Sequence, residues 1–474
     1  MSPMKPIETD VVVVGSGPGG YAAAFYAADK GKKVILVEQE KRLGGVCLQR
    51  GCIPSKALLH ATKMIHEAEV SSARGITFSK PDVQLDKLRA WKEALIDKLS
   101  LGVAGVGQRR GVTLLTGRGL FEDSQTLRVE TAQGQKFIRY QKAIIAVGSK
   151  PAMPKAFDLG NPRIMTSTEA LELQDIPKSL LIVGGGYIGM ELGTVYAALG
   201  SKVVLVEALG TILAGADADL SRYVMKYAEK NFSAVRLNTK VSKMATFGKQ
   251  IKVSMEYDGK KLEEAYDRVL VSVGRASNTE DLGLKNTRVS VDEKGFIKVN
   301  NRLETSDPKI LAIGDAVGGL MLAHKASKEA RIAVEALCGG SGVFENVVIP
   351  AVVFTEPEVA WCGLTESDAR QKGIEIKVSR FPWGASGRAL STDRTDGMTK
   401  LILEPETDRI LGVGIVGAGA GDLISEGVLA VEMGATALDL AQTVHPHPTL
   451  SETLMEAAEA FYGHSTHLYT PKKP

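Results

Sequence analysis

The sequence predicts an α/β protein with two doubly wound parallel sheets and a C-terminal α+β domain. Two observations predict the sheets: the same order of buried strand, glycine-rich turn, helix and strand occurs near the N-terminus and again from residue 180. A third observation, strand-like segments separated by turn residues after about residue 347, predicts the C-terminal domain. With 474 residues, the chain has room for about three domains of ~150 residues each.

The first pattern begins at residue 10 and reads DVVVVGSGPGGYAAAFYAADKGKKVILVE. Its glycines, at G-x-G-x-x-G spacing, are Gly15, Gly17 and Gly20, and its second strand ends in Glu38. Such glycines allow a tight turn, close approach to a pyrophosphate and close packing of helix on strand. The helix N-terminus attracts phosphate, and the acid accepts hydrogen bonds from a ribose hydroxyl. The pattern predicts a Rossmann-like dinucleotide site, with an ordinary glycine turn as the alternative.

The second pattern, LLIVGGGYIGMELGTVYAALGSKVVLVE, repeats the arrangement with Gly184, Gly186, Gly189 and Glu207. A carboxylate at Glu207 repels a 2′-phosphate, and no arginine cluster follows it in EALGTILAG. The second ligand is therefore expected to be NAD rather than NADP. The first site, which leads directly into a cysteine pair, is expected to hold a flavin dinucleotide, FAD.

Later strand ends add candidate cofactor contacts. The apolar run KAIIAVGSKP contains Gly148, and KILAIGDAVGG places Asp315 after a strand. A carboxylate at the carboxyl end of a parallel strand suits a ligand hydroxyl, although an aspartate in a plain turn is the common alternative. Gly274, which follows another apolar run, is also expected to contact a cofactor.

Bulk properties exclude several classes of protein. The formal net charge of +3 is small for this length, so the charge balance indicates neither nucleic acid nor a membrane surface as a partner. No apolar run approaches the ~18 residues of a membrane span. The start, MSPMKPIETDVVVVG, resembles neither a signal peptide nor a transit segment. A cytoplasmic location is expected, where disulfides are usually catalytic or redox-sensing.

Two of the four cysteines lie together in GGVCLQRGCIPSK. On a regular helix, Cys47 and Cys52 would be roughly 8–9 Å apart, beyond the ~7 Å that a disulfide tolerates, so a bridge needs the distortion that Gly51 permits. Pro54 fits the first turn of a helix that continues from there, which places Cys52 where a thiolate is favoured. We expect a reducible, catalytic pair; a chance pair and a metal site without further ligands are the alternatives.

The other two thiols, Cys338 and Cys362, stand alone and are expected to be small buried hydrophobic residues. A flavin site, a redox-active dithiol and an NAD site in one chain indicate electron flow between thiols, flavin and nicotinamide.

At these residues the chain resembles the dihydrolipoamide dehydrogenases, a family of flavin-dependent disulfide reductases, over nearly its whole length. The matching segments are GGVCLQRGCIPSK, GGGYIGMELG, AIGDAVGG, MLAHKA and HPHPTLSE. Glutathione reductase shares the general plan, but Glu207 argues against its NADP. Mercuric reductases usually carry a C-terminal cysteine pair, which the tail FYGHSTHLYTPKKP lacks.

The resemblance implies a role for each matching residue. Cys52 would face the flavin as the charge-transfer thiolate, and Cys47 would be the interchange thiol that forms a mixed disulfide with the lipoyl group. Lys56 would lie beside the flavin ring and pair with Glu191. The remaining implied contacts are Asp315 with the ribityl chain and Glu38 with the adenosine ribose.

The resemblance also implies that His447 is the base and that Glu452 orients it. The chemistry agrees, because dihydrolipoamide must lose protons and histidine transfers protons near neutral pH. A satisfied loop histidine is the alternative, and His445 is the rival base. The HPH spacing could suggest metal ligands, but no further ligands are apparent, so no metal site is expected. We further predict that Tyr187 covers the flavin until nicotinamide enters, with simple packing as the alternative.

In the family, the base and the interchange thiol meet across a dimer interface, which implies a homodimer with shared active sites. The partner is expected to be the lipoyl group of a 2-oxo acid dehydrogenase complex or a glycine cleavage protein. The segment Gly397–Gly417 is a probable hairpin with PETD at its turn. The expected divisions are an FAD domain (1–150), an NAD domain (151–277), a central segment completing the FAD domain (278–346) and an interface domain (347–474).

The expected reaction is oxidation of protein-bound dihydrolipoamide with reduction of NAD. An NADH-dependent reductase of another disulfide is an alternative within the class. A non-catalytic flavoprotein scaffold subunit is an alternative from a different class, although the intact residues Cys47, Cys52 and His447 argue against it.

Overall fold

The first sheet begins with a strand of buried valines and is parallel except for one antiparallel edge. The computed structural model describes residues 5–345 and 347–469. The strand order is β3-β2-β1-β6-β5-β4, and β17 pairs with β6, so a segment far along the chain returns to this sheet. Its strands are β1 (Ile7–Val14), β2 (Val34–Glu38), β3 (Thr113–Thr116), β4 (Arg118–Phe121), β5 (Thr126–Thr131), β6 (Gly134–Ile145) and β17 (Ile310–Ala312).

Helices from both parts of the chain cover this sheet. The alanine-rich helix α1 packs against α8, which follows β17, and apolar residues of both helices share one buried cluster. The helical elements of this unit are α1 (Pro18–Asp29), α2 (Gly45–Arg50), α3 (Cys52–Val70), η1 (Ser71–Arg74), α4 (Leu85–Arg109), η2 (Leu284–Asn286), η3 (Gly314–Val317) and α8 (Ala323–Leu337).

The second parallel sheet has the order β11-β10-β9-β15-β8 and belongs to the second glycine pattern. A short antiparallel ribbon of β7 and β16 lies where the chain enters and leaves this unit, and β12, β13 and β14 form a separate antiparallel sheet. The elements are β7 (Ser149–Pro151), β8 (Ile164–Met165), α5 (Ser167–Glu172), β9 (Ser179–Val183), α6 (Tyr187–Ala198), β10 (Lys202–Val206), α7 (Ala218–Asn231), β11 (Ala234–Arg236), β12 (Lys240–Phe247), β13 (Gln250–Tyr257), β14 (Lys260–Tyr266), β15 (Arg268–Val271) and β16 (Arg275–Ser277).

The C-terminal domain is an antiparallel sheet with helices. Its strand order is β18-β19-β22-β21-β20, and the predicted hairpin is confirmed, because β21 and β22 pair antiparallel on either side of the PETD turn. The elements are β18 (Ala351–Val353), β19 (Glu358–Gly363), α9 (Glu366–Lys372), β20 (Lys377–Pro382), η4 (Trp383–Ala385), α10 (Gly387–Ser391), β21 (Met398–Leu403), β22 (Ile410–Gly417), α11 (Ala420–Glu432), α12 (Ala437–Gln442) and α13 (Glu452–Tyr462).

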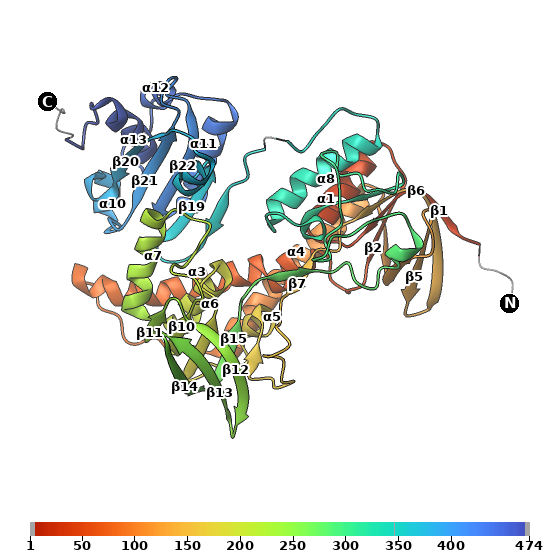
Figure 1. Cartoon of the computed structure of the whole chain (residues 1–474), viewed down its shortest axis with the longest axis horizontal. Coiled ribbons are helices and arrows are strands. Elements are labelled where there is room, and N and C mark those ends of the chain that lie inside the picture. The colour runs from red at the N-terminus through yellow and green to blue at the C-terminus, as the bar shows by residue number, and fades with distance from the viewer. Residues whose placement is uncertain (1–4, 346, 470–474) are drawn as a thin grey trace.

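The three parts meet around α3. Figure 1 shows the first sheet and the C-terminal domain on opposite sides of the molecule, with the second parallel unit below them and α7 beneath the C-terminal sheet. The expected α/β class with two parallel sheets and a C-terminal α+β domain is confirmed. The domain divisions at 150, 277 and 346 stay predictions. Among the described residues, no helix combines the length and the apolar character needed to cross a membrane.

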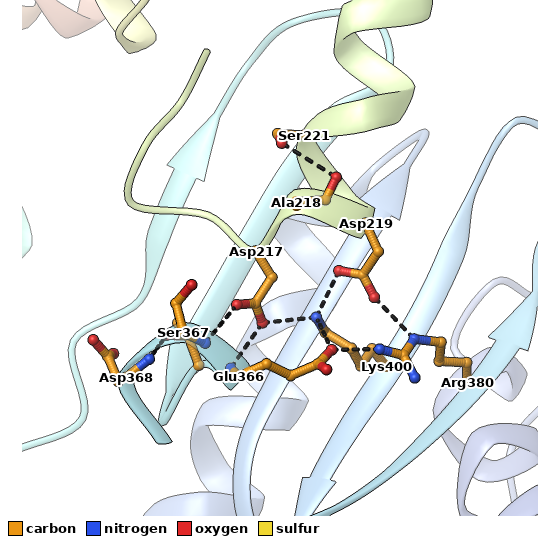
Figure 2. A network of polar contacts seen from close by, with 10 residues as sticks. Asp217, Ala218, Asp219, Ser221, Glu366, Ser367, Asp368, Arg380 and Lys400 are labelled. Atoms are coloured by element: carbon orange, nitrogen blue, oxygen red, sulfur yellow. Dashed lines mark hydrogen bonds and ion pairs between the residues drawn. The ribbon is translucent and has the colours of Figure 1, made fainter. Parts of the chain in front are cut away.

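A buried lysine joins the second unit to the C-terminal domain. Lys400 on β21 is 1% exposed, and its Nζ lies 2.7 Å from Asp217, 2.7 Å from Asp219 and 2.9 Å from Glu366 (Figure 2). Arg380 on β20 also contacts Asp219 and Glu366. The three carboxylates are close enough together to suggest a metal site, but the Lys400 ammonium lies among them and supplies the positive charge. Burial opposes that charge, yet the carboxylates outweigh it and raise the pKa of Lys400.

Candidate active site

A cavity of about 490 Å³ lies at the carboxyl ends of the first sheet's parallel strands. This is the edge where doubly wound sheets bind their ligands. Its walls come from the turns after β1, β2, β6 and β17, from the segment around α2 and α3, and from the start of α6. The predicted residues that line it are Gly15, Gly17, Glu38, Cys47, Cys52, Lys56, Gly148, Tyr187, Glu191 and Asp315.

The glycines of the first turn, between β1 and α1, leave a space that larger side chains would fill. Gly15 has a φ of +101°, and a Cβ built on Gly20 would lie 1.8 Å from the Gly15 carbonyl oxygen. A Cβ on Gly45 would lie 2.6 Å from the Cα of Gly17, so the start of α2 also approaches this turn closely. Together with the N-terminus of α1, this backbone cradle fits a pyrophosphate.

Glu38 accepts hydrogen bonds within its own turn. Its Oε2 accepts bonds from the Ser16 backbone N–H at 2.8 Å and the Ser16 hydroxyl at 2.6 Å, and its Oε1 accepts the Glu40 N–H at 2.9 Å. The second unit repeats this geometry: Glu207 accepts the N–H of Gly185 at 2.6 Å and of Leu209 at 2.8 Å. Both carboxylates are therefore fixed beside their glycine turns, where each suits a ribose.

The second glycine signature builds a separate turn. Gly184 has a φ of +108°, and a Cβ on Gly189 would lie 2.0 Å from the Gly184 carbonyl oxygen, as in the first unit. Gly186 precedes α6, and Gly274 has a φ of +133°. These glycines and Glu207 do not line the large cavity, whereas Tyr187 at the start of α6 does and is 40% exposed. The start of α6 therefore joins the second glycine turn to the cavity.

The helix break at Gly51 brings the cysteine pair to the cavity wall. The helix α2 ends at Arg50, Gly51 has non-helical dihedral angles (φ −146°, ψ −113°), and α3 begins at Cys52. A Cβ at Gly51 would lie only 3.2 Å from the Cα of Cys47. Cys47 and Cys52 are both free in the structure, and their thiols are close enough to interact.

The two thiols are electrostatically unequal. Interaction with the Cys47 thiol is the largest cause that lowers the pKa of Cys52, to about 7, and the positive charge of Lys56 acts in the same direction against burial. The same thiol contact and burial raise the pKa of Cys47. Near neutral pH, Cys52 therefore carries the thiolate of the pair.

Glu191 connects the dithiol helix to two other parts of the chain. Its buried carboxylate on α6 accepts bonds from Lys56 Nζ at 2.8 Å and from the Ser55 hydroxyl at 2.7 Å. It also accepts the backbone N–H of Phe354, after β18, at 3.1 Å, and the Lys56 ammonium lies 4.6 Å from the Phe354 ring centroid. The expected pair of Lys56 and Glu191 is thus present, and it holds α3, α6 and the C-terminal domain together.

Asp315 reaches the cavity with two partners that sequence reasoning missed. The Ser149 hydroxyl donates to its carboxylate, and Arg275 donates to Ser149 Oγ at 2.7 Å and to the Ser149 carbonyl at 2.8 Å. The guanidinium itself lies 3.9 Å from Asp315. Ser149 and Arg275 belong to the connecting strands β7 and β16, so only the tertiary fold brings them together.

His447 pairs with Glu452 as the motif suggests. Its Nδ1 lies 2.9 Å from Glu452 Oε1, and Glu452 Oε2 accepts the Thr449 N–H at 2.7 Å. Burial opposes the charge on Glu452, but these two partners lower its pKa. The rival, His445, has both ring nitrogens engaged, by Glu426 at 2.7 Å and by a backbone carbonyl at 2.8 Å.

The His447 ring is 70% exposed on the C-terminal domain and does not line the cavity within its own chain. The dyad and the dithiol are therefore separate in one subunit.

One cysteine prediction is wrong. Cys338 is exposed, because it follows the last residue of α8, where the chain turns into solvent at Gly339. Cys362 is buried as expected, and burial raises its pKa to about 12.

The fold and this site define a class of protein: a two-dinucleotide oxidoreductase with a dithiol beside the first dinucleotide site. A family model described as pyridine nucleotide-disulphide oxidoreductase matches residues 9–330, and the dimerisation-domain model of the same family matches residues 349–458. The chain belongs to the pyridine nucleotide-disulphide oxidoreductase family.

Curated relatives match nearly the whole chain. Dihydrolipoyl dehydrogenase of Haemophilus influenzae is 46% identical over 469 residues, covering 99% of this chain and 98% of the relative. Dihydrolipoyl dehydrogenase of Vibrio parahaemolyticus is 45% identical over 471 residues with the same coverage. Among solved structures, LpdA of Mycobacterium tuberculosis has a TM-score of 0.88 at 26% identity, covering 95% of this chain and 99% of that chain.

Proposed function

We propose that the chain is a dihydrolipoyl dehydrogenase, which oxidises protein-bound dihydrolipoamide and reduces NAD⁺ to NADH. The observation that carries the proposal is the cysteine pair on the cavity wall beside Lys56, where the pKa of Cys52 is lowered and that of Cys47 is raised. Relatives of this name at 43–46% identity over nearly the full chain support it.

The first unit would hold FAD, with the pyrophosphate at the Gly15–Gly20 turn, the adenosine ribose at Glu38 and the ribityl chain at Asp315. The second unit would hold NAD at the Gly184–Gly189 turn, with Glu207 on the ribose. FAD supplies a two-electron acceptor between the dithiol and NAD⁺. Gly148 lines the cavity and would contact FAD, while Gly274 would contact NAD.

Thiol exchange follows from the charges of the pair. In the bridged form, a dihydrolipoamide thiolate attacks Cys47 Sγ, the Cys47–Cys52 bond breaks, and the electron pair leaves on Cys52. Cys52 is the better leaving thiol, because the positive charge of Lys56 lowers its pKa. The Lys56 ammonium stabilises the new thiolate. The second dihydrolipoamide sulfur then attacks the mixed disulfide, which releases lipoamide and the reduced Cys47.

The partner subunit's His447 would remove the protons from dihydrolipoamide. The Nδ1 contact with Glu452 orients the ring and stabilises its protonated form. Because the ring is far from the cavity in its own chain, the site is complete only in a homodimer with shared active sites.

The lipoyl group would come from a 2-oxo acid dehydrogenase complex or a glycine cleavage protein in the cytoplasm. The proposed divisions of the chain remain 1–150, 151–277, 278–346 and 347–474.

Steady-state assays test this function. The purified protein should reduce NAD⁺ with dihydrolipoamide and use NADP⁺ poorly, and Cys47→Ser should abolish the reaction. Higher activity as an NADH-dependent reductase of glutathione disulfide or another disulfide would favour the alternative within the class. A flavin-containing protein that is inert in every assay would favour a scaffold subunit.

A further inference from the structure

The single turn that carries Asp315 is held at both ends by one buried ion pair. This turn, η3, runs from Gly314 to Val317 and is followed by Gly318. Glu329 on α8 accepts the Gly314 N–H at 2.6 Å. Lys325, one helical turn earlier, donates to the Gly318 carbonyl at 3.1 Å and contacts Glu329 at 2.6 Å.

The surroundings make this pair unlike an ordinary surface pair at i, i+4. The side chains of Lys325 and Glu329 are 7% and 2% exposed. Gly314 and Gly318 both have left-handed φ angles, +73° and +78°, so the backbone of the turn is irregular and needs partners for its polar groups. Burial raises the pKa of Glu329, and the charge of Asp315 adds to this effect.

General stability does not require charges here. A buried ion pair loses its hydration, and replacing both partners by apolar residues is often neutral or stabilising. The charged pair instead fixes the position of the turn. The Glu329 carboxylate accepts the N–H at the start of η3, and the Lys325 ammonium donates to the carbonyl after its end. Asp315 is the residue between them that lines the cavity.

We propose that Lys325 and Glu329 are positioning residues that hold the η3 turn so that Asp315 retains the bound FAD. The inference rests on the proposed contact of Asp315 with FAD. Neither side chain lines the cavity, so the two residues act through the turn and not by touching the cofactor.

The test is the rate at which the purified holoenzyme releases FAD on dilution, followed by the fluorescence of free FAD. Glu329→Leu removes the acceptor and the charge, and should release FAD roughly 10- to 100-fold faster, as expected for the loss of a charge-assisted hydrogen bond. Glu329→Gln keeps an acceptor for the Gly314 N–H and should be intermediate. If Glu329→Leu does not fold, the Gln variant carries the test.

Two further comparisons separate positioning from general destabilisation. In an Asp315→Asn background, which should itself release FAD faster, the additional effect of a Glu329 variant should fall below about twofold. Lys400→Met, which breaks a buried ion cluster elsewhere, should lower the melting temperature and leave FAD release unchanged.

Release at the wild-type rate by both Glu329 variants would overturn the inference, as would an equal fold-change in the Asp315→Asn background or in Lys400→Met. If Asp315→Asn alone retains FAD normally, the proposed contact of Asp315 fails together with this inference. If Asp315→Asn releases FAD faster and Glu329→Leu does not, only the inference fails.

Discussion

Lys56 and Glu191 are 135 positions apart in the sequence, yet the Lys56 ammonium lies 2.8 Å from the Glu191 carboxylate, whose side chain is 3% exposed. This pair places a positive charge one helical turn after Cys52. It also fixes α3 against α6 of the second parallel unit. The buried Glu191 carboxylate therefore connects the dithiol helix to the helix of the second dinucleotide site through both Lys56 and Ser55.

Lys56→Met should raise the pKa of Cys52 above its value of about 7, because the substitution removes a stabilising positive charge and leaves the negative charge of Glu191 without a cation beside it. A rise of about one unit would lower the thiolate fraction at neutral pH about fivefold. The measurement is the pH dependence of the long-wavelength absorbance of the reduced holoenzyme. For wild type, this absorbance should be lost as pH falls through about 7.

Lys63→Met is the matched control, because Lys63 lies on the same helix α3 and its substitution removes the same charge. Its midpoint should stay at the wild-type value. Equal midpoints for the wild type and Lys56→Met would show that Lys56 does not stabilise the thiolate.

His447→Gln should lower kcat for dihydrolipoamide oxidation by about 10²- to 10⁴-fold, the usual contribution of a positioned acid or base. Glu452→Gln should have a smaller effect in the same direction, because the ring keeps a hydrogen-bonding neighbour. NADH oxidation by ferricyanide, which needs no proton transfer from a dithiol, serves as the control and should remain. A His447→Gln enzyme with normal dihydrolipoamide turnover would remove this residue from the mechanism.

Short-range constraints explain which parts of the site the sequence predicts. The glycine turns, the break at Gly51 and the pair of His447 with Glu452 each depend on residues close in sequence. The sequence context of Cys338 is apolar because residues of α8 such as Val334 and Ala336 are buried, but the cysteine itself follows the end of that helix and is exposed.

Contacts between distant segments could not be predicted from local patterns. Ser149 and Arg275 meet because β7 and β16 pair where the chain enters and leaves the second unit. The link from Glu191 to Phe354 depends on how the C-terminal domain packs. Nothing in the sequence around Lys400 marks it as buried, and only the fold brings Asp217, before α7, and Glu366, on α9, to its ammonium.

Lys400→Met should lower the free energy of unfolding by about 3–5 kcal/mol, because it leaves clustered carboxylates without their buried ammonium. The exposed pair of Lys226 with Asp396, from α7 to the C-terminal domain, provides the control. Lys226→Met should change stability by no more than about 1 kcal/mol. Denaturant unfolding of both variants checks this, and equal losses would contradict a special role for the cluster.

Acid should weaken the same cluster. Burial opposes ionisation of Asp219, but Lys400 outweighs it and keeps the pKa of Asp219 below its usual value. A depressed pKa contributes stability that is present above the unfolded pKa and is lost as pH falls through the folded pKa. In Lys400→Met this part of the acid dependence should become smaller, because only Arg380 still lowers the pKa of Asp219, and unfolding curves at decreasing pH would detect the change.

Tyr187→Val should change the kinetics of NAD binding, because the ring lies at the junction of the second glycine turn and the cavity. Removing a side chain that must move aside should raise the association rate several-fold, measured by stopped-flow fluorescence. Tyr187→Phe keeps the ring and should behave as wild type. An unchanged association rate of NAD in Tyr187→Val would show that this side chain only packs and does not control access of NAD.

The most direct measurement of the central claim is the visible spectrum of the purified protein before and after anaerobic addition of dihydrolipoamide. We predict flavin bands at the start and a new long-wavelength band after the addition, which Cys52→Ser abolishes. A protein without flavin bands, or with a spectrum that dihydrolipoamide leaves unchanged, would contradict the claim that the Cys47–Cys52 pair transfers electrons to FAD.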